Sequence, residues 1–202
     1  MSEKIVNTDI KVRKAEKEDL NDILRILSSS FEREIEKIFG DAHEGREILK
    51  RALESLNELK GIYVAESSKI LGCVGILAKE IDNKIPIGRE AVKSLGFTKG
   101  TRAKLLLSFF KEKPKKNDVC IDYLAVSKFY RNMGVGSALY SKVEELARLN
   151  NKNRIRVWVS VENDEAIDFF MKRSFNIAKM LDSKYAEKYF GQRYWYLLEK
   201  LL

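Results

Sequence analysis

The sequence has little of the chemistry on which many enzyme classes depend. Its 202 residues include two cysteines, Cys73 and Cys120, and one histidine, His43. A disulfide-stabilised secreted fold and a four-ligand structural zinc site need more such residues, so both are excluded and no metal is expected. His43 stands in a polar segment with no nucleophile motif near it, which excludes a serine–histidine–aspartate triad. We expect an exposed His43 near a helix start.

Long hydrophobic runs are also missing. The longest apolar run, residues 105–107, is far short of the roughly 20 residues that a membrane-spanning helix needs. The first residues lead into no apolar segment of the kind found in a secretory signal. We therefore expect a cytoplasmic protein with no membrane association.

Apolar and charged residues are plentiful. Apolar residues make up 45% of the chain and charged residues 34%, and 38 Lys and Arg against 30 Asp and Glu give a formal net charge of +8. A chain of this length buries roughly 70% of its unfolded surface, so a disordered protein is excluded. The length favours a single domain over residues 1–202.

Hydrophobic periodicity predicts a mixed α/β fold, with a strand hairpin early and a strand–helix–strand unit late. The expected strands cover residues 9–13, 62–66, 70–78, 119–126, 154–161 and 193–201. The expected helices begin after Asp19, run from Ile48 to Leu59 with an end at Gly61, and cover residues 137–149 and 164–173.

Residues 79–118 do not fit this pattern and are expected to be an insertion. They contain both prolines and an amphipathic stretch, residues 102–110, whose Leu105, Leu106, Phe109 and Phe110 are expected on one helical face. Seven basic residues between positions 99 and 116 are opposed only by Glu112. This basic run is either a solvated helix face, an anion-facing lid or partner-binding helix, or a patch for nucleic acid.

The segment most indicative of chemistry is residues 121–139, where a strand leads through a glycine-bearing loop into a helix. Such a loop exposes successive backbone N–H groups at a helix N-terminus, which suits a phosphate group. No Gly-Lys-Ser/Thr follows, and one glycine of the dinucleotide fingerprint is missing, so neither of those nucleotide loops is present. From spacing alone, an ordinary strand–helix turn stays open beside the phosphate site.

Two motifs in this part of the chain resemble those of the GNAT superfamily of acyl-CoA-dependent N-acetyltransferases. Arg131-Asn132-Met133-Gly134-Val135-Gly136 is similar to its Gln/Arg-x-x-Gly-x-Gly/Ala pyrophosphate loop, and the usual Leu-Ala-Val strand end precedes it. Residues 163–175 resemble the family's Asn-x-x-Ala-x-x-Phe-Tyr-x-x-x-Gly-Phe motif. The order of elements agrees from about residue 9 to residue 201. The resemblance implies the GNAT fold, a mostly antiparallel sheet flanked by helices, with a helical insertion before the cofactor-binding strand.

The resemblance also implies acetyl-CoA as co-substrate and a set of contacts to it. The residues expected to bind the pantetheine arm and the pyrophosphate are Leu124, Ala125, Val126, Arg131, Asn132, Met133, Gly134, Val135, Gly136, Ser137, Asn163 and Phe170. The Leu124 amide is expected to polarise the thioester carbonyl. Read from the residues alone, Asn163 is also a helix N-cap, and the two roles are compatible.

The chain departs from the family pattern at two positions. Phe170 stands where the family usually has a tyrosine, the proposed general acid, and a phenyl ring has no proton to give. Tyr185, Tyr189 and Tyr194 are candidates to replace it. Ser174 stands where a glycine with positive φ is usual, at a cost of about 1 kcal/mol.

An amine acceptor has a pKa near about 10 and needs a base at neutral pH. Strand alternation predicts that Cys120, Asp122 and Leu124 share one face of their strand, with Tyr123 on the other. The resemblance makes Asp122 the candidate base, against the alternative of a structural hydrogen bond or ion pair. Cys120 is expected to be a buried core thiol rather than a nucleophile.

The expected activity is direct acetyl transfer from acetyl-CoA to a primary amine, which is a protein N-terminus, a lysine or a small molecule. Two alternatives stay open: an acyl-CoA-binding module without turnover, for which Phe170 argues, and a nucleic-acid-associated basic protein. A homodimer is also left open.

Overall fold

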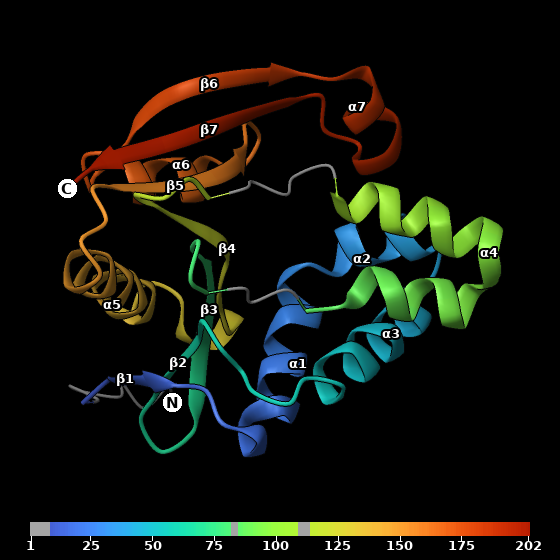
Figure 1. Ribbon diagram of the computed structural model, residues 1–202, viewed down its shortest axis with the longest axis horizontal. Coiled ribbons are helices and arrows are strands. Elements are labelled where there is room, and N and C mark those ends of the chain that lie inside the picture. The colour runs from blue at the N-terminus through green and yellow to red at the C-terminus, as the bar shows by residue number, and fades with distance from the viewer. Residues whose placement is uncertain (1–8, 82–84, 109–113) are drawn as a thin grey trace, which may run out of the picture.

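A computed structural model describes residues 9–81, 85–108 and 114–202 of the protein. They form a seven-stranded, mostly antiparallel sheet with the strand order β1-β2-β3-β4-β5-β7-β6 (Figure 1). The strands are β1 (Lys11–Lys14), β2 (Ile62–Glu66), β3 (Ile70–Leu77), β4 (Asp118–Val126), β5 (Arg154–Ser160), β6 (Asn176–Asp182) and β7 (Tyr194–Leu201). Among these strands the one parallel pair is β4 with β5.

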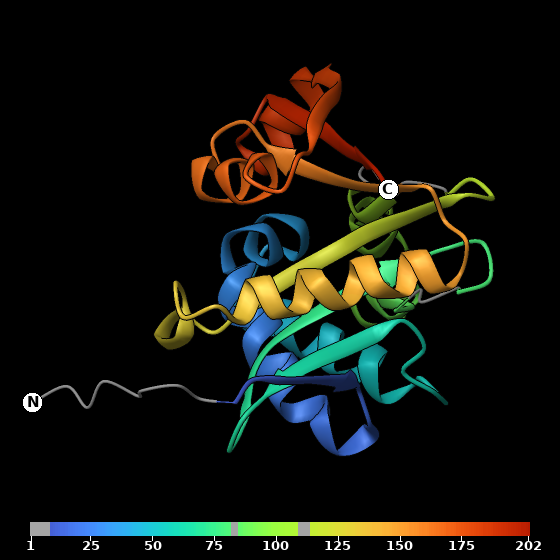
Figure 2. The same cartoon turned by 90° about the vertical axis from the view of Figure 1, so that its left-hand side faces the viewer.

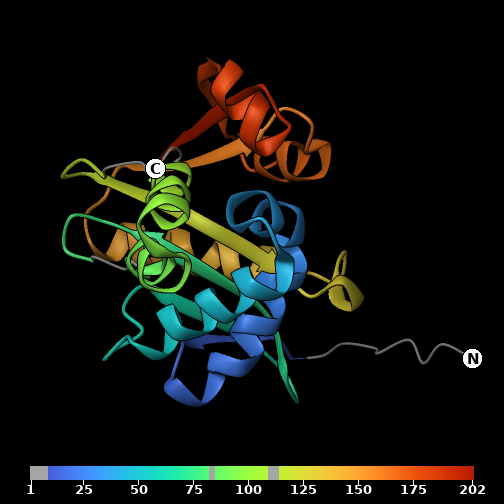
Figure 3. The same cartoon turned by 90° about the vertical axis from the view of Figure 1, so that its right-hand side faces the viewer.

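Helices cover both faces of the sheet. They are α1 (Leu20–Ser30), α2 (Glu32–Phe39), α3 (Ala42–Glu54), α4 (Ile87–Ser108), α5 (Val135–Leu149), α6 (Asp164–Met171) and α7 (Lys184–Phe190). One core lies between the sheet and helices α1 to α4, and a second lies between the sheet and helix α5. Figure 2 shows α5 crossing one face, and Figure 3 shows α3 and α4 on the opposite side.

The predicted fold class and helical insertion are confirmed. The insertion is helix α4, which consists of two halves that meet at Gly96. This glycine has φ +74° and ψ 178°, and the helix turns back on itself there. A Cβ on Gly100 would lie 2.3 Å from the Cα of Val92, so only glycine lets the two halves pack this closely. No helix in the described ranges is long and apolar enough to cross a bilayer.

Several sequence-based expectations need correction. The second predicted helix ends at Glu54, and Leu56 and Leu59 pack on the core from the turn that follows. Helices α2 and α7 and strand β6 were not expected. Leu105 is 58% exposed whereas its neighbour Leu106 is fully buried, so the two do not share the apolar face. Phe109 and Phe110 lie outside the described residues.

Other expectations hold. His43 is exposed in the first turn of α3, after the Asp41 N-cap, whose side chain accepts a hydrogen bond from the Glu44 amide. Ser174 has φ +66°, which is the left-handed conformation that the family pattern implies for this position.

Candidate active site

The candidate site opens where strands β4 and β5 separate. The two strands pair from Asp118 with Arg154 to Ile121 with Val157, and neither continues the pairing beyond that point. A cavity of about 760 Å³ lies at the divergence, lined on one side by β4 residues 120–124 and on the other by β5 residues 156–160. This volume falls within the roughly 300–1,000 Å³ typical of ligand sites.

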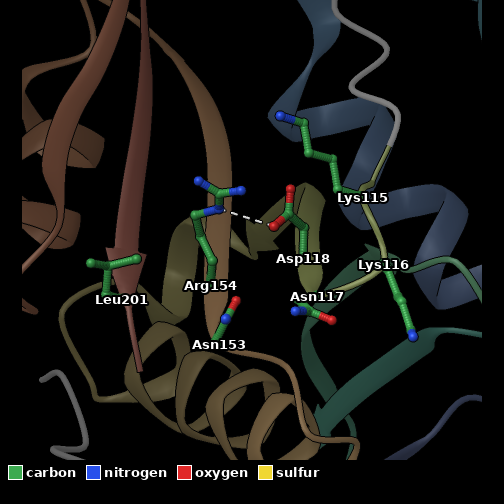
Figure 4. Close-up of a pocket in the computed structure, with 7 residues that line it drawn as sticks. All are labelled: Lys115, Lys116, Asn117, Asp118, Asn153, Arg154 and Leu201. Carbon is green, nitrogen blue, oxygen red and sulfur yellow. Dashed lines mark hydrogen bonds and ion pairs between the residues drawn. The ribbon is translucent and has the colours of Figure 1, made fainter.

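Ion pairs hold β4 and β5 together at the end where the two strands are paired. Asp118 is fully buried and accepts a hydrogen bond of 2.9 Å from Arg154 Nε, as Figure 4 shows. Arg156 Nη1 lies 3.7 Å from the second carboxylate oxygen of Asp118, and Arg154 Nη1 lies 3.6 Å from Glu199 on β7. These charges join β4, β5 and β7 at the end opposite to the divergence.

The open edge of β4 presents backbone groups to the cavity. The Ser127 amide donates to the Leu71 carbonyl of β3 over 2.9 Å, which fixes the phase of the antiparallel ladder. Because hydrogen-bonded pairs alternate along such a ladder, Ala125 and Tyr123 direct their amides to β3. Leu124 and Val126 therefore direct theirs to the side from which β5 has diverged.

A β-bulge lies at Asp122. The β3–β4 register shifts between Gly75, opposite Tyr123, and Ile76, opposite Ile121, so Asp122 has no register partner. Ile121 and Leu124, which strict alternation would separate, pack in the same core on the α5 side. The expectation that Cys120, Asp122 and Leu124 share one face is therefore wrong. The extra residue leaves Asp122 exposed at the cavity wall.

The glycine loop leads from β4 into α5. Asn132 has φ +59° and Gly134 has φ +84°, and α5 begins at Val135. The first N–H groups of a helix have no partner within it, and no described side chain caps this end. The loop therefore offers backbone donors and the positive end of a helix dipole to an anion.

Sequence reasoning missed Arg173, which lies beside this helix N-terminus. Its guanidinium donates to Ser137 Oγ and to the Phe169 carbonyl, each over 2.6 Å, and stacks 3.6 Å from the centroid of the Phe169 ring. Burial lowers the pKa of Arg173 from its ordinary value, but an arginine stays charged. Its position near the end of the motif over residues 163–175 is the sequence feature that could have identified it. Arg131 is exposed, with Nη1 3.9 Å from Glu165.

Some of the remaining candidates line the cavity and others do not. Asn163 caps α6 by accepting from the Ala166 amide over 3.1 Å, and it also lines the cavity. Phe170 is 4% exposed and lines the cavity among packed aromatic rings. The tyrosine among the described lining residues is Tyr123. The proposed substitutes Tyr185, Tyr189 and Tyr194 lie elsewhere, on α7 and at the start of β7.

The two cysteines are buried, as expected. Burial raises the pKa of the Cys73 thiol to about 12, which makes it unreactive. Cys120 lies in the cavity wall at 2% exposure. Within the described ranges, no group of three or more His, Cys, Asp or Glu side chains is placed to hold a metal ion.

A comparison with protein-family models decides the family, because residues 20–175 match the model described as the acetyltransferase (GNAT) family. The chain belongs to the GNAT acetyltransferase family. This family's general activity is acyl-CoA-dependent N-acetyl transfer, so the protein is an acyltransferase with acetyl-CoA as the implied co-substrate. A search of the curated proteins gave no match.

Solved structures share the GNAT fold over nearly their full length. The crystal structure of Ard1 from Thermoplasma volcanium is 20% identical with a TM-score of 0.60, over 96% of this chain and 97% of that one. A GNAT acetyltransferase from Streptococcus pneumoniae is also 20% identical, with a TM-score of 0.59 over 96% and 99% of the chains. A further acetyltransferase structure reaches a TM-score of 0.64 at 19% identity, over 95% and 98%.

Proposed function

We propose that the protein transfers the acetyl group of acetyl-CoA directly to a primary amine in the cavity between β4 and β5. The observation that carries this proposal is the divergence of β4 from β5 beyond Ile121 and Val157, which leaves a cavity beside the edge of β4, the strand that leads into the glycine loop. A thioester lying there reaches backbone donors, a carboxylate and the second substrate without a covalent intermediate on the protein.

Backbone groups hold the co-substrate in this proposal. The amides from Asn132 to Ser137 bind the pyrophosphate, where the loop conformation and the α5 N-terminus favour negative charge. Leu124 and Val126 pair with the pantetheine arm as an added strand would. The Leu124 amide then polarises the thioester carbonyl. Asn163 and Phe170 supply a polar and an apolar part of the wall.

Asp122 acts as the base. Asp122 is exposed and lines the cavity beside the bulge, which supports a carboxylate that takes a proton from the acceptor ammonium directly or through one water. The departing thiol has a pKa of about 8.5, so it can leave as a thiolate that solvent protonates. The phenyl ring of Phe170 therefore does not prevent transfer.

The Asp122→Asn variant tests this role. Because a positioned base contributes about 10²–10⁴-fold, we expect kcat to fall at least a hundredfold while the Kd for acetyl-CoA changes less than about threefold. Raising the pH should recover part of the rate, since more of the amine is then unprotonated. Asp168→Asn, a substitution of an exposed aspartate on α6, is the matched control. Unchanged kcat for Asp122→Asn at every pH would show that Asp122 is not the base.

A further inference from the structure

The shape and lining of the cavity point to the class of acceptor. We infer that the acceptor is a primary amine attached to a bulky apolar group, bound on the side of the sheet that carries helices α1, α2 and α4. This inference rests on the proposed acetyl transfer and adds which amines the site selects.

The cavity reaches both faces of the sheet. On the α5 side the wall comes from α6 and its N-cap, with Asn163, Ala166 and Phe170. On the other side the wall comes from α1, α2, α4, α7, β5 and β7. Since the loop and the α5 N-terminus hold the anionic end of acetyl-CoA in the proposed function, this second wall faces the acceptor, and we call it the acceptor wall.

The acceptor wall is mostly apolar. Its larger members are Phe31, Ile38, Leu107, Trp158, Phe190 and Trp195. The acidic side chains that line the cavity are Glu34 and Asp122, and both suit an ammonium group. Of the two basic ones, Arg156 lies within 4 Å of both Asp118 and Glu199, so its charge is already balanced. The other, Lys79, is exposed. An apolar group beside the amine fits the apolar part of this lining, whereas a charged group against those side chains would lose its water without gaining a partner.

The apolar wall is a packed part of the fold. Leu106 of α4 is fully buried in a third core with Phe190 and Trp195, and Ile38 and Trp158 pack against the same core. The insertion therefore joins α2, α7, β5 and β7 around one end of the cavity. A wall that these packed elements hold keeps its shape before the acceptor arrives, which favours selection by fit.

Thiol release from acetyl-CoA with matched acceptors tests the inference. The panel comprises two peptides identical except for a first residue of phenylalanine or glycine, together with phenylethylamine and ethanolamine. Burial of a phenyl group predicts that kcat/KM for each apolar acceptor exceeds that of its polar counterpart at least tenfold. Activity with phenylethylamine as high as with the phenylalanine peptide identifies a small amine as the source; activity confined to the peptide identifies a polypeptide N-terminus.

Two leucines of α4 provide a matched pair of variants. Leu107 is half-buried and lines the cavity, whereas Leu105 is 58% exposed and does not belong to the described lining residues. We expect Leu107→Asp to reduce the preference for the apolar acceptor at least tenfold with unchanged affinity for acetyl-CoA. Leu105→Asp should preserve the preference.

The outcomes separate the two claims. The inference is overturned if kcat/KM is equal for apolar and polar acceptors. It is also overturned if Leu107→Asp and Leu105→Asp change the preference for the apolar acceptor equally. Neither result would contradict acetyl transfer itself. If acetyl-CoA binds but no amine of the panel causes thiol release, the proposed function is overturned and this inference with it.

Discussion

Replacement of Gly134 by valine separates the glycine loop's role in binding from its role in folding. Gly134, the N-cap of α5, has φ +84° and ψ −8°. Gly40, at the end of α2, has nearly the same backbone conformation, φ +90° and ψ −14°. A Cβ at either position would meet no atom within 4 Å, so the two sites differ in location and not in strain or crowding.

The expected magnitudes follow from this match. A side chain in the left-handed region costs about 1–2 kcal/mol, so Gly134→Val and Gly40→Val should each lower the Tm by roughly 2–8 °C. Gly134→Val should also lose one or two hydrogen bonds to the pyrophosphate, each worth about 1.5–3 kcal/mol. Its Kd for acetyl-CoA should therefore rise about a hundredfold, whereas that of Gly40→Val should not change.

Calorimetric titration with acetyl-CoA, combined with thermal unfolding of each variant, is the assay. Gly134→Val that binds acetyl-CoA within about threefold of the unmodified protein would refute the phosphate-binding role of the loop. An equal loss of affinity in Gly40→Val would show that the effect comes from reduced stability.

Two further predictions concern arginines outside the glycine loop. Asp19 is 6% exposed and pairs with Arg13 through both carboxylate oxygens, at 2.7 and 2.9 Å, and the pairing lowers the pKa of Asp19 below its ordinary 3.8. A carboxyl group whose pKa is lower in the native state stabilises the fold at pH values above its unfolded-state pKa. This stabilisation is lost as the pH falls through its native-state pKa. Asp19→Asn should thus lower the free energy of unfolding, measured with urea, by about 2–4 kcal/mol at pH 7 and by progressively less below pH ~4. A loss of stability that does not depend on pH would contradict this prediction. Arg173→Ala should raise the Kd for acetyl-CoA about tenfold, because the guanidinium holds Ser137 and adds positive charge at the α5 N-terminus. Arg173→Lys, which keeps the charge, should recover part of the affinity. Unchanged affinity in Arg173→Ala would show that Arg173 has only a structural role.

The local elements of the site could be predicted because their signals are local. The strand, the glycine loop and the helix that follows are adjacent in sequence, and their motifs fix the family. The Asn163 cap and the positive φ of Ser174 likewise depend on a few neighbouring residues.

The bulge at Asp122 could not be predicted, because it results from the register of β4 against β3, which the sequence of β4 alone does not show. Strand β6 gave no alternating signal, since nearly all of its residues are exposed. Helix α2 has Ile35 and Phe39 as its buried residues among mostly charged neighbours, which is too sparse a stripe to identify. The acceptor wall joins distant segments, and no single-sequence pattern shows which of them meet.

Direct acetyl transfer is tested by calorimetric titration of the unmodified protein with acetyl-CoA, with free thiol measured in the same sample before and after addition of an amine. We expect saturable binding, slow thiol release with acetyl-CoA alone and a faster release when phenylethylamine is added. Absence of binding would contradict the assignment of the β4–β5 cavity and glycine loop, and tight binding without thiol release for any amine would contradict acetyl transfer.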